Sequence, residues 1–406
     1  ALIEFGFVKS KSDPCVFIYQ TNEPVWLLNK EGQQVTDPKE RDQIYSQPTA
    51  TSYDSKGNVI GYQLLGANDQ PLCHKIIIGQ YVADCLIGYS RDNPLMEELY
   101  EFLREKGHKF TVEEMNFFLN MAVKRKRQER KLTLSQRQHM EKVVEDILGQ
   151  DAEKINSRET PLPDGYMPEP SADHAGDRLA MTEEIKSNYR SWTASLLWIS
   201  RTVPEIKFAV GQLCRHMQNP SVDHINDVKK VARYLVGNLD RGLTFTGNRL
   251  DVNAQSDSDW GACKHTRRSC TGYVVFIGES LVIAKSQMQK LVALSSMEAE
   301  LIALNETAKS VMYYRTLLGE LGFVQTEKSI ILVDNQSCIQ MSKSQMAVYR
   351  NRHIPLRYFY IKDLLKDDVE LTWVGSADNV ADLFTKSVAK DLFAKHKEKV
   401  SGVVIG

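Results

Sequence analysis

"SIILVDNQSCIQ", residues 329–340, is a five-residue apolar strand pattern that runs directly into Asp334 and the polar start of a helix. A buried strand followed at once by a helix is typical of α/β sheets. Ligands bind beyond the carboxyl ends of such strands, which is where Asp334 lies. The alternative is that Asp334 or Asn335 only caps the next helix, and the segment alone does not decide between the two.

The chain on both sides of this segment alternates between strand and helix patterns. Strands are predicted at 250–256, 272–278, 281–285, 329–333 and 369–374, and helices at 296–320, 335–343, 354–366 and 379–396. Three strands, a long helix, a buried strand, further helices, a last strand and a terminal helix indicate an α/β domain. We expect a mixed five-stranded sheet with flanking helices.

Acidic residues stand at the ends of these predicted elements. In VNAQSDSDW an alternating strand ends in Asp257 and Asp259, which share one face because strand side chains repeat every two residues. Asp382, in WVGSADNVADLFTK, falls in the first turn of the last predicted helix. Taken singly, a polar strand end and a carboxylate that stabilises a helix dipole would also explain these residues.

The long predicted helix carries two glutamates on opposite sides of its apolar stripe. Its stripe, in ALSSMEAELIAL and beyond, consists of Met297, Leu301, Leu304 and Ala308. At about 100° per residue, Glu300 lies on one side of the stripe and Glu298 on the other, so they cannot both reach one site. Glu300 is deeper in the helix and is expected to face the sheet, whereas Glu298 fits a helix start.

The acids on separate elements become informative when they are taken together. Asp257, Glu300, Asp334 and Asp382 are predicted to converge at one edge of the sheet. Two Mg²⁺ or Mn²⁺ ions about 4 Å apart bind only where several carboxylates meet, because hard cations need oxygen ligands. Such a pair activates water and stabilises the leaving oxygen of a phosphodiester, which is the chemistry of a nuclease.

The composition is that of a globular protein. The 406 residues predict about two to four domains, and the formal net charge of −1 gives no overall basic field to attract nucleic acid. Seven scattered cysteines without a C-x-x-C pair favour reduced thiols. The absence of a signal peptide and of an apolar run of about 18 residues predicts a cytoplasmic or nuclear protein without a membrane partner. The start at ALIEFGFVKS, without Met, indicates a piece of a longer chain.

The first part of the chain shows shorter elements. The predicted elements are apolar strands at 15–19 and 76–87, a helix from Asn93 to Gly107, two strands within 115–136 around a charged turn, and a helix at 136–148. Residues 157–185, with four prolines, indicate a linker, and two or three amphipathic helices are expected in 188–237. The insertion-like stretch 21–70 has no role that the sequence reveals.

Many of these segments together resemble the C-terminal part of the Pol polyprotein of copia-type LTR retrotransposons. In order, they are GFVKSKSDPCVFIY, YVADCLI, YRSWTASLLWISRTVPEI, KKVARYLVGNLDRGLTF, SDSDWGACKHTRRSCTGYVVFIG, LSSMEAELIAL, VDNQSCIQ, RHIPLRYFYIKD and NVADLFTK. The resemblance implies an α+β and α/β multidomain chain. Its parts would be a truncated reverse-transcriptase palm with an insertion at 1–92, a thumb-like segment at 93–156, a linker and helical connection at 157–245, and an RNase H-like domain at 246–400.

The resemblance also implies roles for single residues. Asp257, Glu300, Asp334 and Asp382 would be the catalytic acids that hold two Mg²⁺ or Mn²⁺ ions, with Asp259 the weaker choice on the first strand. The substrate implied is an RNA/DNA hybrid, whose RNA strand is hydrolysed.

The polymerase part departs from the family pattern. Tyr81 and Asp84 remain, but Ala83 replaces the first of the paired aspartates, and a methyl group cannot bind a metal ion. The fingers and early palm are also missing, so reverse-transcriptase activity is predicted to be absent. Without the fingers, apolar surface of the palm would be exposed, which favours self-association or contact with upstream Pol segments.

Basic residues provide candidate contacts to nucleic acid. They are Lys124, Arg125, Lys126 and Arg127 in KRKRQERK, and Arg267 and Arg268 after the first acidic strand. The first run would equally fit a solvated turn. Phosphate contacts carry no base specificity, and a hybrid is recognised by groove shape and 2′-hydroxyls. The chain is therefore predicted to be a hybrid-specific ribonuclease, with a non-catalytic nucleic-acid-binding remnant as the alternative.

Overall fold

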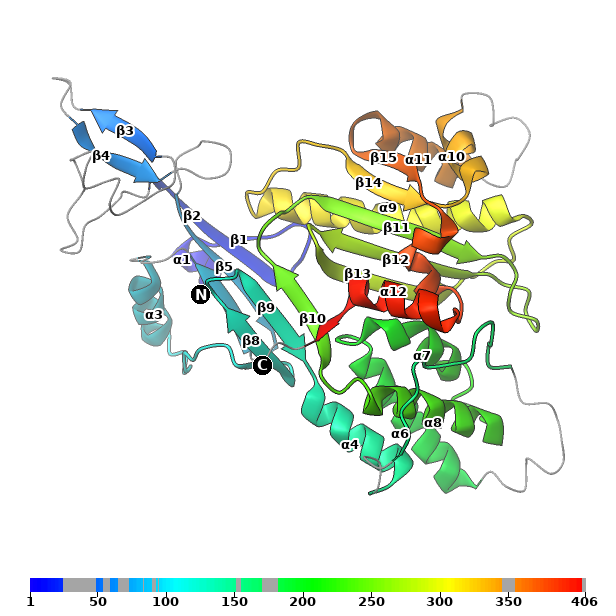
Figure 1. The fold of residues 1–406 in the computed structure, drawn as a ribbon. Coiled ribbons are helices and arrows are strands. Elements are labelled where there is room, and N and C mark those ends of the chain that lie inside the picture. The colour runs from blue at the N-terminus through cyan, green and yellow to red at the C-terminus, as the bar shows by residue number, and fades with distance from the viewer. Residues whose placement is uncertain are drawn as a thin grey trace. The chain divides into compact units, whose positions relative to one another are not determined.

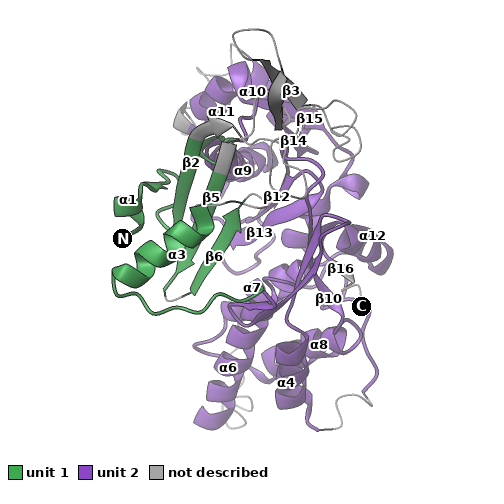
Figure 2. Ribbon diagram, turned by 90° about the vertical axis from the view of Figure 1, so that its left-hand side faces the viewer, with its two compact units in different colours: residues 1–114, 319–322 green, residues 115–318, 323–406 purple. Residues whose placement is uncertain are grey.

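The computed structural model describes residues 1–24, 49–53, 59–64, 73–82, 84–89, 93, 95–150, 155–169, 182–344 and 355–403. They form a mixed α/β structure with several sheets (Figure 1). Two compact units are formed by Ala1–Glu114 with Gly319–Gly322, and by Met115–Leu318 with Phe323–Gly406 (Figure 2). Within the described residues, none of the helices combines the length and the apolar character that a bilayer crossing requires.

The first unit is built on a four-stranded antiparallel sheet of order β1-β2-β5-β6. Its elements are α1 (Leu2–Phe5), β1 (Val8–Lys9), β2 (Val16–Pro24), β5 (Cys73–Tyr81), β6 (Asp84–Tyr89) and α3 (Leu95–Glu105), with a separate hairpin of β3 (Thr49–Tyr53) and β4 (Val59–Leu64). Ile76 and Ile78 of β5 pack with Met96 and Leu99 of α3, so the helix covers one face of the sheet.

The predicted single strand at 76–87 is wrong. The chain turns at Val82, whose φ is 53°, and residues on either side pair as an antiparallel hairpin. Only β5 is buried, because β6 lies at the sheet edge and leaves Leu86 40% exposed. The predicted helix after Asn93 is confirmed as α3, and the Asn93 side chain accepts a hydrogen bond from Leu95 N at 3.1 Å.

The second unit contains a five-stranded antiparallel sheet of order β16-β10-β9-β8-β7. Its strands are β7 (Phe117–Phe118), β8 (Met121–Lys126), β9 (Lys131–Ser135), β10 (Arg241–Thr246) and β16 (Gly402–Val403). The predicted hairpin is confirmed, whereas β10 was not predicted, although Leu243 and Phe245 alternate with Thr244 and Thr246. Its pairing with β9 depends on residues far away in the sequence.

Helices of the same unit follow the predicted amphipathic segments. They are α4 (Arg137–Leu148), α6 (Glu183–Ile199), α7 (Lys207–Cys214) and α8 (Val222–Val236). In the predicted linker, residues 155–169 form no helix or strand, yet Leu162 is buried in the core, and 170–181 lie outside the described residues. The linker region therefore contributes to the packed structure.

The mixed five-stranded sheet predicted from the sequence is confirmed. Its order is β13-β12-β11-β14-β15, formed by β11 (Val252–Asp259), β12 (Cys270–Ile277), β13 (Ser280–Met288), β14 (Ser329–Val333) and β15 (Val369–Trp373). The first three strands are antiparallel, whereas β14 runs parallel to both β11 and β15. The carboxyl ends of β11, β14 and β15 consequently meet at one edge.

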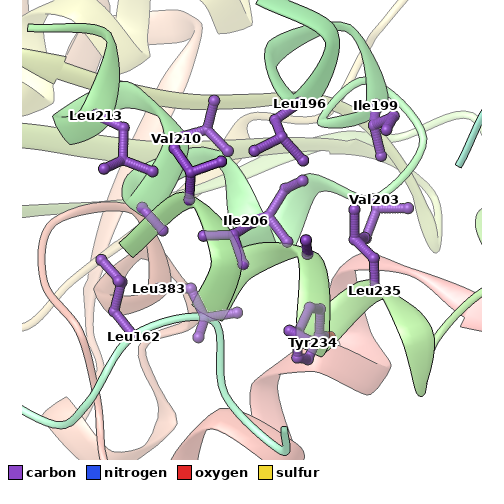
Figure 3. Close-up of a cluster of buried hydrophobic side chains, with 14 of the residues drawn as sticks. Leu162, Leu196, Ile199, Val203, Ile206, Val210, Leu213, Tyr234, Leu235 and Leu383 are labelled. Carbon is purple, nitrogen blue, oxygen red and sulfur yellow. The ribbon is translucent and has the colours of Figure 1, made fainter. Parts of the chain in front are cut away.

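Each face of this sheet is covered by a different core. On one face lie α9 (Ser296–Glu320), α10 (Gln336–Lys343) and α11 (Pro355–Asp367), and the predicted stripe residues Leu301, Leu304 and Ala308 are buried there. The other face packs against α7 and η5, and residues of α6 and α8 belong to the same core. Figure 3 shows this second core, in which Ile206 and Val210 lie with Leu383 and Tyr234. Helices that precede residue 246 are thus part of the domain that contains the sheet.

The predicted helix at 379–396 is wrong, because the chain forms a 3₁₀ turn η5 (Val380–Phe384) and then α12 (Lys390–Val400). A shorter 3₁₀ turn, η4 (Ser376–Asp378), precedes them. Between η5 and α12, the Ser387 hydroxyl donates to Tyr166 O at 2.9 Å and Ser387 O accepts from Gly165 N. These bonds, with the burial of Val388, hold the segment in a non-helical path. Asp382 therefore lies in the 3₁₀ turn and not in the first turn of an α-helix.

Candidate active site

Three carboxylates meet at the carboxyl edge of the mixed sheet. One ligand oxygen from each of Asp257, Glu300 and Asp334 lies within 4.8 Å of the other two. The parallel pairing of Ser256 with Val333 explains part of this arrangement, because Asp257 and Asp334 follow those residues on adjacent strands. Glu300, in the second turn of α9, reaches the same edge from the helical layer.

Hydrogen bonds from neighbouring segments orient each of these carboxylates. Ser258 N donates to Glu300 Oε1 at 3.1 Å, and the Ser376 hydroxyl donates to Asp334 Oδ2 at 2.9 Å. The Thr385 hydroxyl donates to Asp257 Oδ2. Glu300 Oε2 is buried without a partner among the described residues. The acids are therefore fixed in direction while retaining an oxygen that can bind a cation.

The fourth predicted acid, Asp382, comes from η5 on the other face of the sheet. Its Oδ2 lies 2.9 Å from Lys386 Nζ, and its Oδ1 is buried with no partner in the part of the chain that the structure describes. Asp382 is near enough to Asp257 to raise the pKa of that carboxyl by charge repulsion. All four predicted acids are therefore in one electrostatic neighbourhood.

Burial and mutual repulsion shift the pKa values of these acids upward. Burial, followed by the charge of Asp382, raises the pKa of Asp257 to about 6. Burial and the charges of Asp257 and Asp334 raise the pKa of Glu300 well above its usual value. Carboxylates held this close repel one another, which favours their protonated forms. A bound cation would relieve this repulsion and stabilise the charged forms.

The donor set fits a divalent cation. Carboxylate oxygens are the ligands that Mg²⁺ and Mn²⁺ take, and two of these oxygens, Glu300 Oε2 and Asp382 Oδ1, are buried without a partner in the described chain. Buried polar atoms without partners cost free energy, so their presence at the point where carboxylates converge favours a cation there. Asp257, Glu300, Asp334 and Asp382 are the residues that would hold it.

Comparison with known proteins identifies the chain. No protein-family model matches it. The retrovirus-related Pol polyprotein from transposon TNT 1-94 of Nicotiana tabacum is 33% identical to it over 80% of this chain, and that from transposon RE2 of Arabidopsis thaliana is 29% identical over 80%. The chain belongs to the Pol polyproteins of copia-type retrotransposons. This Pol chain spans 24% and 21% of those two relatives.

Solved RNase H structures resemble the Pol chain only weakly. The N-terminal RNase H domain of Rv2228c from Mycobacterium tuberculosis is 16% identical, with a TM-score of 0.25, and the match covers 37% of this chain and 97% of that one. LC11-RNase H1 in complex with an RNA/DNA hybrid is 11% identical, with a TM-score of 0.27, over 35% and 99%. Scores this low do not establish a shared fold.

Two other acids near the site have separate roles in the Pol chain. Glu298 Oε2 accepts a hydrogen bond from Leu294 N at 2.7 Å, which fits the helix-start role considered for it. Asp259 Oδ1 accepts from Cys270 N at 2.6 Å across the strand pair. Burial raises the pKa of Asp259 to about 7, with a further contribution from Asp257. Neither acid belongs to the group of three converging carboxylates.

Sequence reasoning missed the residues that support the acids. Thr385 and Lys386 were part of the quoted NVADLFTK but received no role, although each contacts an acid. The spacing of Lys386, four residues after Asp382, was the available signal, because such pairs meet on a helical turn. Ser376 carried no signal, since its contact with Asp334 depends on how β15 ends.

The residues of the predicted polymerase remnant lie in the first unit. Tyr81 and Asp84 face each other across the β5–β6 turn, while Ala83 lies outside the described residues. In the described chain, Asp84 belongs to no group of three side chains that could hold a metal ion.

The predicted nucleic-acid contacts lie on two loops of the second unit. Lys124, Arg125, Lys126 and Arg127 are in the β8–β9 hairpin, where Lys126 Nζ lies 3.7 Å from Glu129. Arg267 and Arg268 are exposed in the loop between β11 and β12. The β11–β12 loop begins at the edge of the mixed sheet where the acids meet. The β8–β9 hairpin belongs to the antiparallel five-stranded sheet.

Proposed function

We propose that the acid cluster of the mixed sheet hydrolyses the RNA strand of RNA/DNA hybrids with two divalent metal ions, in an RNase H-like domain. The observation that carries the proposal is the convergence of Asp257, Glu300 and Asp334, with Asp382 beside them. Kinship with retrotransposon Pol polyproteins supports a nucleic-acid substrate. When bound, the ions supply an activated water and stabilise the leaving 3′-oxygen.

The chain's own residues would hold and aim this apparatus. Thr385, Ser258 and Ser376 fix the directions of the carboxylates that face the cations. Lys386 offsets negative charge near Asp382 at a position that is 45% exposed, so its ammonium can also meet a phosphate that enters. The domain would bind hybrids without sequence specificity, because a hybrid is recognised by its shape and 2′-hydroxyls.

Binding of the hybrid would draw on the basic residues outside the acid cluster. Exposed arginines at 267 and 268, and the hairpin cations at 124–127, would contact phosphates without base specificity. Raising the salt concentration should therefore weaken binding.

Hydrolysis of a labelled RNA/DNA hybrid in Mg²⁺ tests the proposal. We expect cutting of the RNA strand, and a loss of about 100-fold or more in the Asp334→Asn variant, because even residues that only support metal ligands cost 10–100-fold. Cutting no faster than this variant would remove the enzyme claim. Salt-sensitive binding without turnover would then favour the non-catalytic remnant.

We further infer that the polymerase part is inactive. Ala83 supplies no carboxylate beside Asp84, and two-metal chemistry needs several converging acids. A primer-extension assay on an RNA template should give no product, and extension by this chain would contradict the inference.

A further inference from the structure

Two exposed tryptophans stand next to the acid cluster. Trp260 follows Asp259 at the end of β11 and is 56% exposed, and Trp373 ends β15 and is 53% exposed. A tryptophan side chain is usually largely buried, because its ring carries a large apolar surface. Two half-exposed rings at one sheet edge therefore indicate a binding surface.

Both rings are held in place by their indole N–H groups. Trp260 Nε1 donates to Ala293 O at 3.0 Å, and Trp373 Nε1 donates to Asp334 O at 3.1 Å. Since each N–H is already paired, what remains exposed is the apolar ring face. The two carbonyls lie in the segment that leads into α9 and at an acid of the cluster itself, so the rings are tied to the segments that place Glu300 and Asp334.

The strand order places the two rings on either side of Asp334. β14 lies between β11 and β15, and neighbouring strands are about 4.8 Å apart, so the axes of the outer two are about 10 Å apart. Trp373 is level with Ser256 of β11, and Trp260 lies four residues beyond that level, about 13 Å further along the strand direction. Trp373 lies on the same face of β15 as Val369 and Leu371, because strand side chains alternate between the two faces. Val369 and Leu371 pack in the core with α9, the helix that carries Glu300. A strand whose phosphate reached Asp334 and Glu300 would have one ring on each side.

The surroundings of Trp260 carry positive charge suited to a nucleic acid. Arg267 and Arg268, in the loop that follows Trp260, are exposed and form no ion pair with any residue that the structure describes. Lys264 of the same loop is bound to Glu169 at 2.6 Å. Aromatic rings beside cations suit a nucleic-acid strand, and because the bases of a hybrid are already paired, the rings would pack against its sugars.

We propose that Trp260 and Trp373 form a stacking rim that grips the substrate strand on both sides of the bond to be cut. The inference rests on the proposed function, because it assigns the rings to the same nucleic-acid substrate. The rings would act through contact with the sugars and not through charge. They are therefore positioning residues that set affinity and register.

Binding of a fluorescein-labelled RNA/DNA hybrid to the whole chain tests the stacking rim. Anisotropy is measured in Mg²⁺ in the Asp334→Asn background, so that the substrate is not cut. Trp260→Ala and Trp373→Ala should each weaken binding about fivefold, because the loss of the apolar contact between one ring and the strand removes about 1 kcal/mol of binding free energy. The Phe variants should retain most of the affinity, because they keep an aromatic face.

Two further readings separate stacking from other effects. The slope of log affinity against log salt should not change in the Ala variants, because no cation is removed. Hybrid should also shield the intrinsic tryptophan fluorescence from acrylamide, and this shielding should shrink in Trp260→Phe.

The matched control is Leu291→Ala, in the neighbouring loop, where Leu291 is 64% exposed. It should leave hybrid affinity unchanged. An equal loss for Leu291→Ala and Trp260→Ala would overturn stacking in favour of a general apolar patch that fits a protein partner. Unchanged affinity in both Trp→Ala variants would overturn the rim while leaving the proposed function intact. A parent chain that neither binds nor cuts hybrid would overturn both.

Discussion

The ammonium of Lys386 lies 2.9 Å from Oδ2 of Asp382, four residues earlier in the chain. In the described residues, no other lysine or arginine forms an ion pair with Asp257, Glu300, Asp334 or Asp382. Burial alone would lower the pKa of Lys386, but the charges of Asp257 and Asp382 outweigh it and raise the pKa. Lys386 thus acts as an internal counter-ion of the acid cluster.

Replacing Lys386 by methionine should separate two properties of the cluster. Without metal, the melting temperature should fall, because four acids lose their nearest positive charge. Affinity for Mn²⁺ should rise about three- to tenfold, since a neighbouring cation no longer opposes the ion. Calorimetric Mn²⁺ titration and thermal melts in EDTA measure the two effects, with Lys386→Arg as the control that keeps the charge. Unchanged or weaker Mn²⁺ binding in the methionine variant would refute this role.

Acid should destabilise the second unit through its stacked histidines. The rings of His216 and His224 lie 3.9 Å apart between centroids and are nearly parallel, at 15°. Burial, followed by the charge of His224, lowers the pKa of His216 to about 4. At pH 8, well above the usual pKa of 6.5, the residue is neutral in both folded and unfolded chains. As the pH falls from about 6.5 to about 4, the unfolded chain binds the proton first, so stability is lost.

His216→Phe keeps a stacked ring that cannot titrate. We expect the free energy of unfolding to fall less steeply in this variant between pH 6.5 and 4, by at most about 1.4 kcal/mol per pH unit. Chemical denaturation at several pH values measures the slopes of variant and parent. The acids with raised pKa values gain stability as the pH falls, which is opposite to the effect of His216. Because they are present in both chains, subtracting the parent slope from the variant slope removes their contribution. Parallel slopes would count against this assignment.

The buried pair of Arg241 and Glu205 should be costly to break. Arg241 Nε lies 3.7 Å from Glu205 Oε1, which also accepts from the Tyr234 hydroxyl at 3.0 Å. Burial raises the pKa of Glu205 even though Arg241 opposes the shift. Arg241→Met should cost about 3 kcal/mol at pH 8, because a buried charge loses its partner.

Protonation should relieve part of that loss. At pH 5 the cost of Arg241→Met should be smaller, since a carboxyl with a raised folded pKa loses stability as the pH rises through that value. Adding Glu205→Gln should rescue stability at pH 8, because the amide carries no charge. Urea unfolding measures the loss of stability caused by Arg241→Met at each pH. An equal loss at pH 8 and pH 5 would contradict the assumption that Glu205 is ionised in the variant at pH 8.

Residues 246–400 alone should not unfold cooperatively. One face of the mixed sheet, with Val274 and Leu281, is buried in one core with Val210 of α7 and with Ile206, the residue before this helix. Removing everything before residue 246 exposes that face to water, which costs about 25 cal/mol per Å² of apolar surface. Thermal melts should show a cooperative transition for 115–403 and a broad one or precipitation for 246–400. A sharp transition for the shorter piece would overturn this expectation.

Three acids of the cluster were accessible from the sequence because each belongs to a predictable strand or helix, whereas Asp382 was placed in a helix that does not form. Asp257 and Asp334 follow strand patterns, and Glu300 lies beside an apolar stripe whose helical period is clear. Periodicity identifies an apolar face, but it does not name the surface that the face covers. The packing of α7 on the mixed sheet was therefore not predictable, and neither was the two-residue strand β16.

The supporting contacts depend on chain geometry that local patterns do not encode. Thr385 reaches Asp257 only because η5 ends before a helix can continue, and that break is enforced by contacts with Tyr166, more than two hundred residues earlier in the sequence. Trp260 and Trp373 stood in the quoted motifs, yet an exposed ring and a buried one look the same in a sequence.

The acids are delivered by β11, α9, the end of β14 and η5, in that order along the chain. During synthesis the centre is therefore unfinished until the segment around Asp382 has left the ribosome and docked. Under the proposed function, a growing polypeptide or a proteolytic fragment that lacks η5 would be missing one of the four carboxylates that hold the cations. If the proposed function is right, the chain would therefore become able to cut nucleic acid only after its whole second unit had folded.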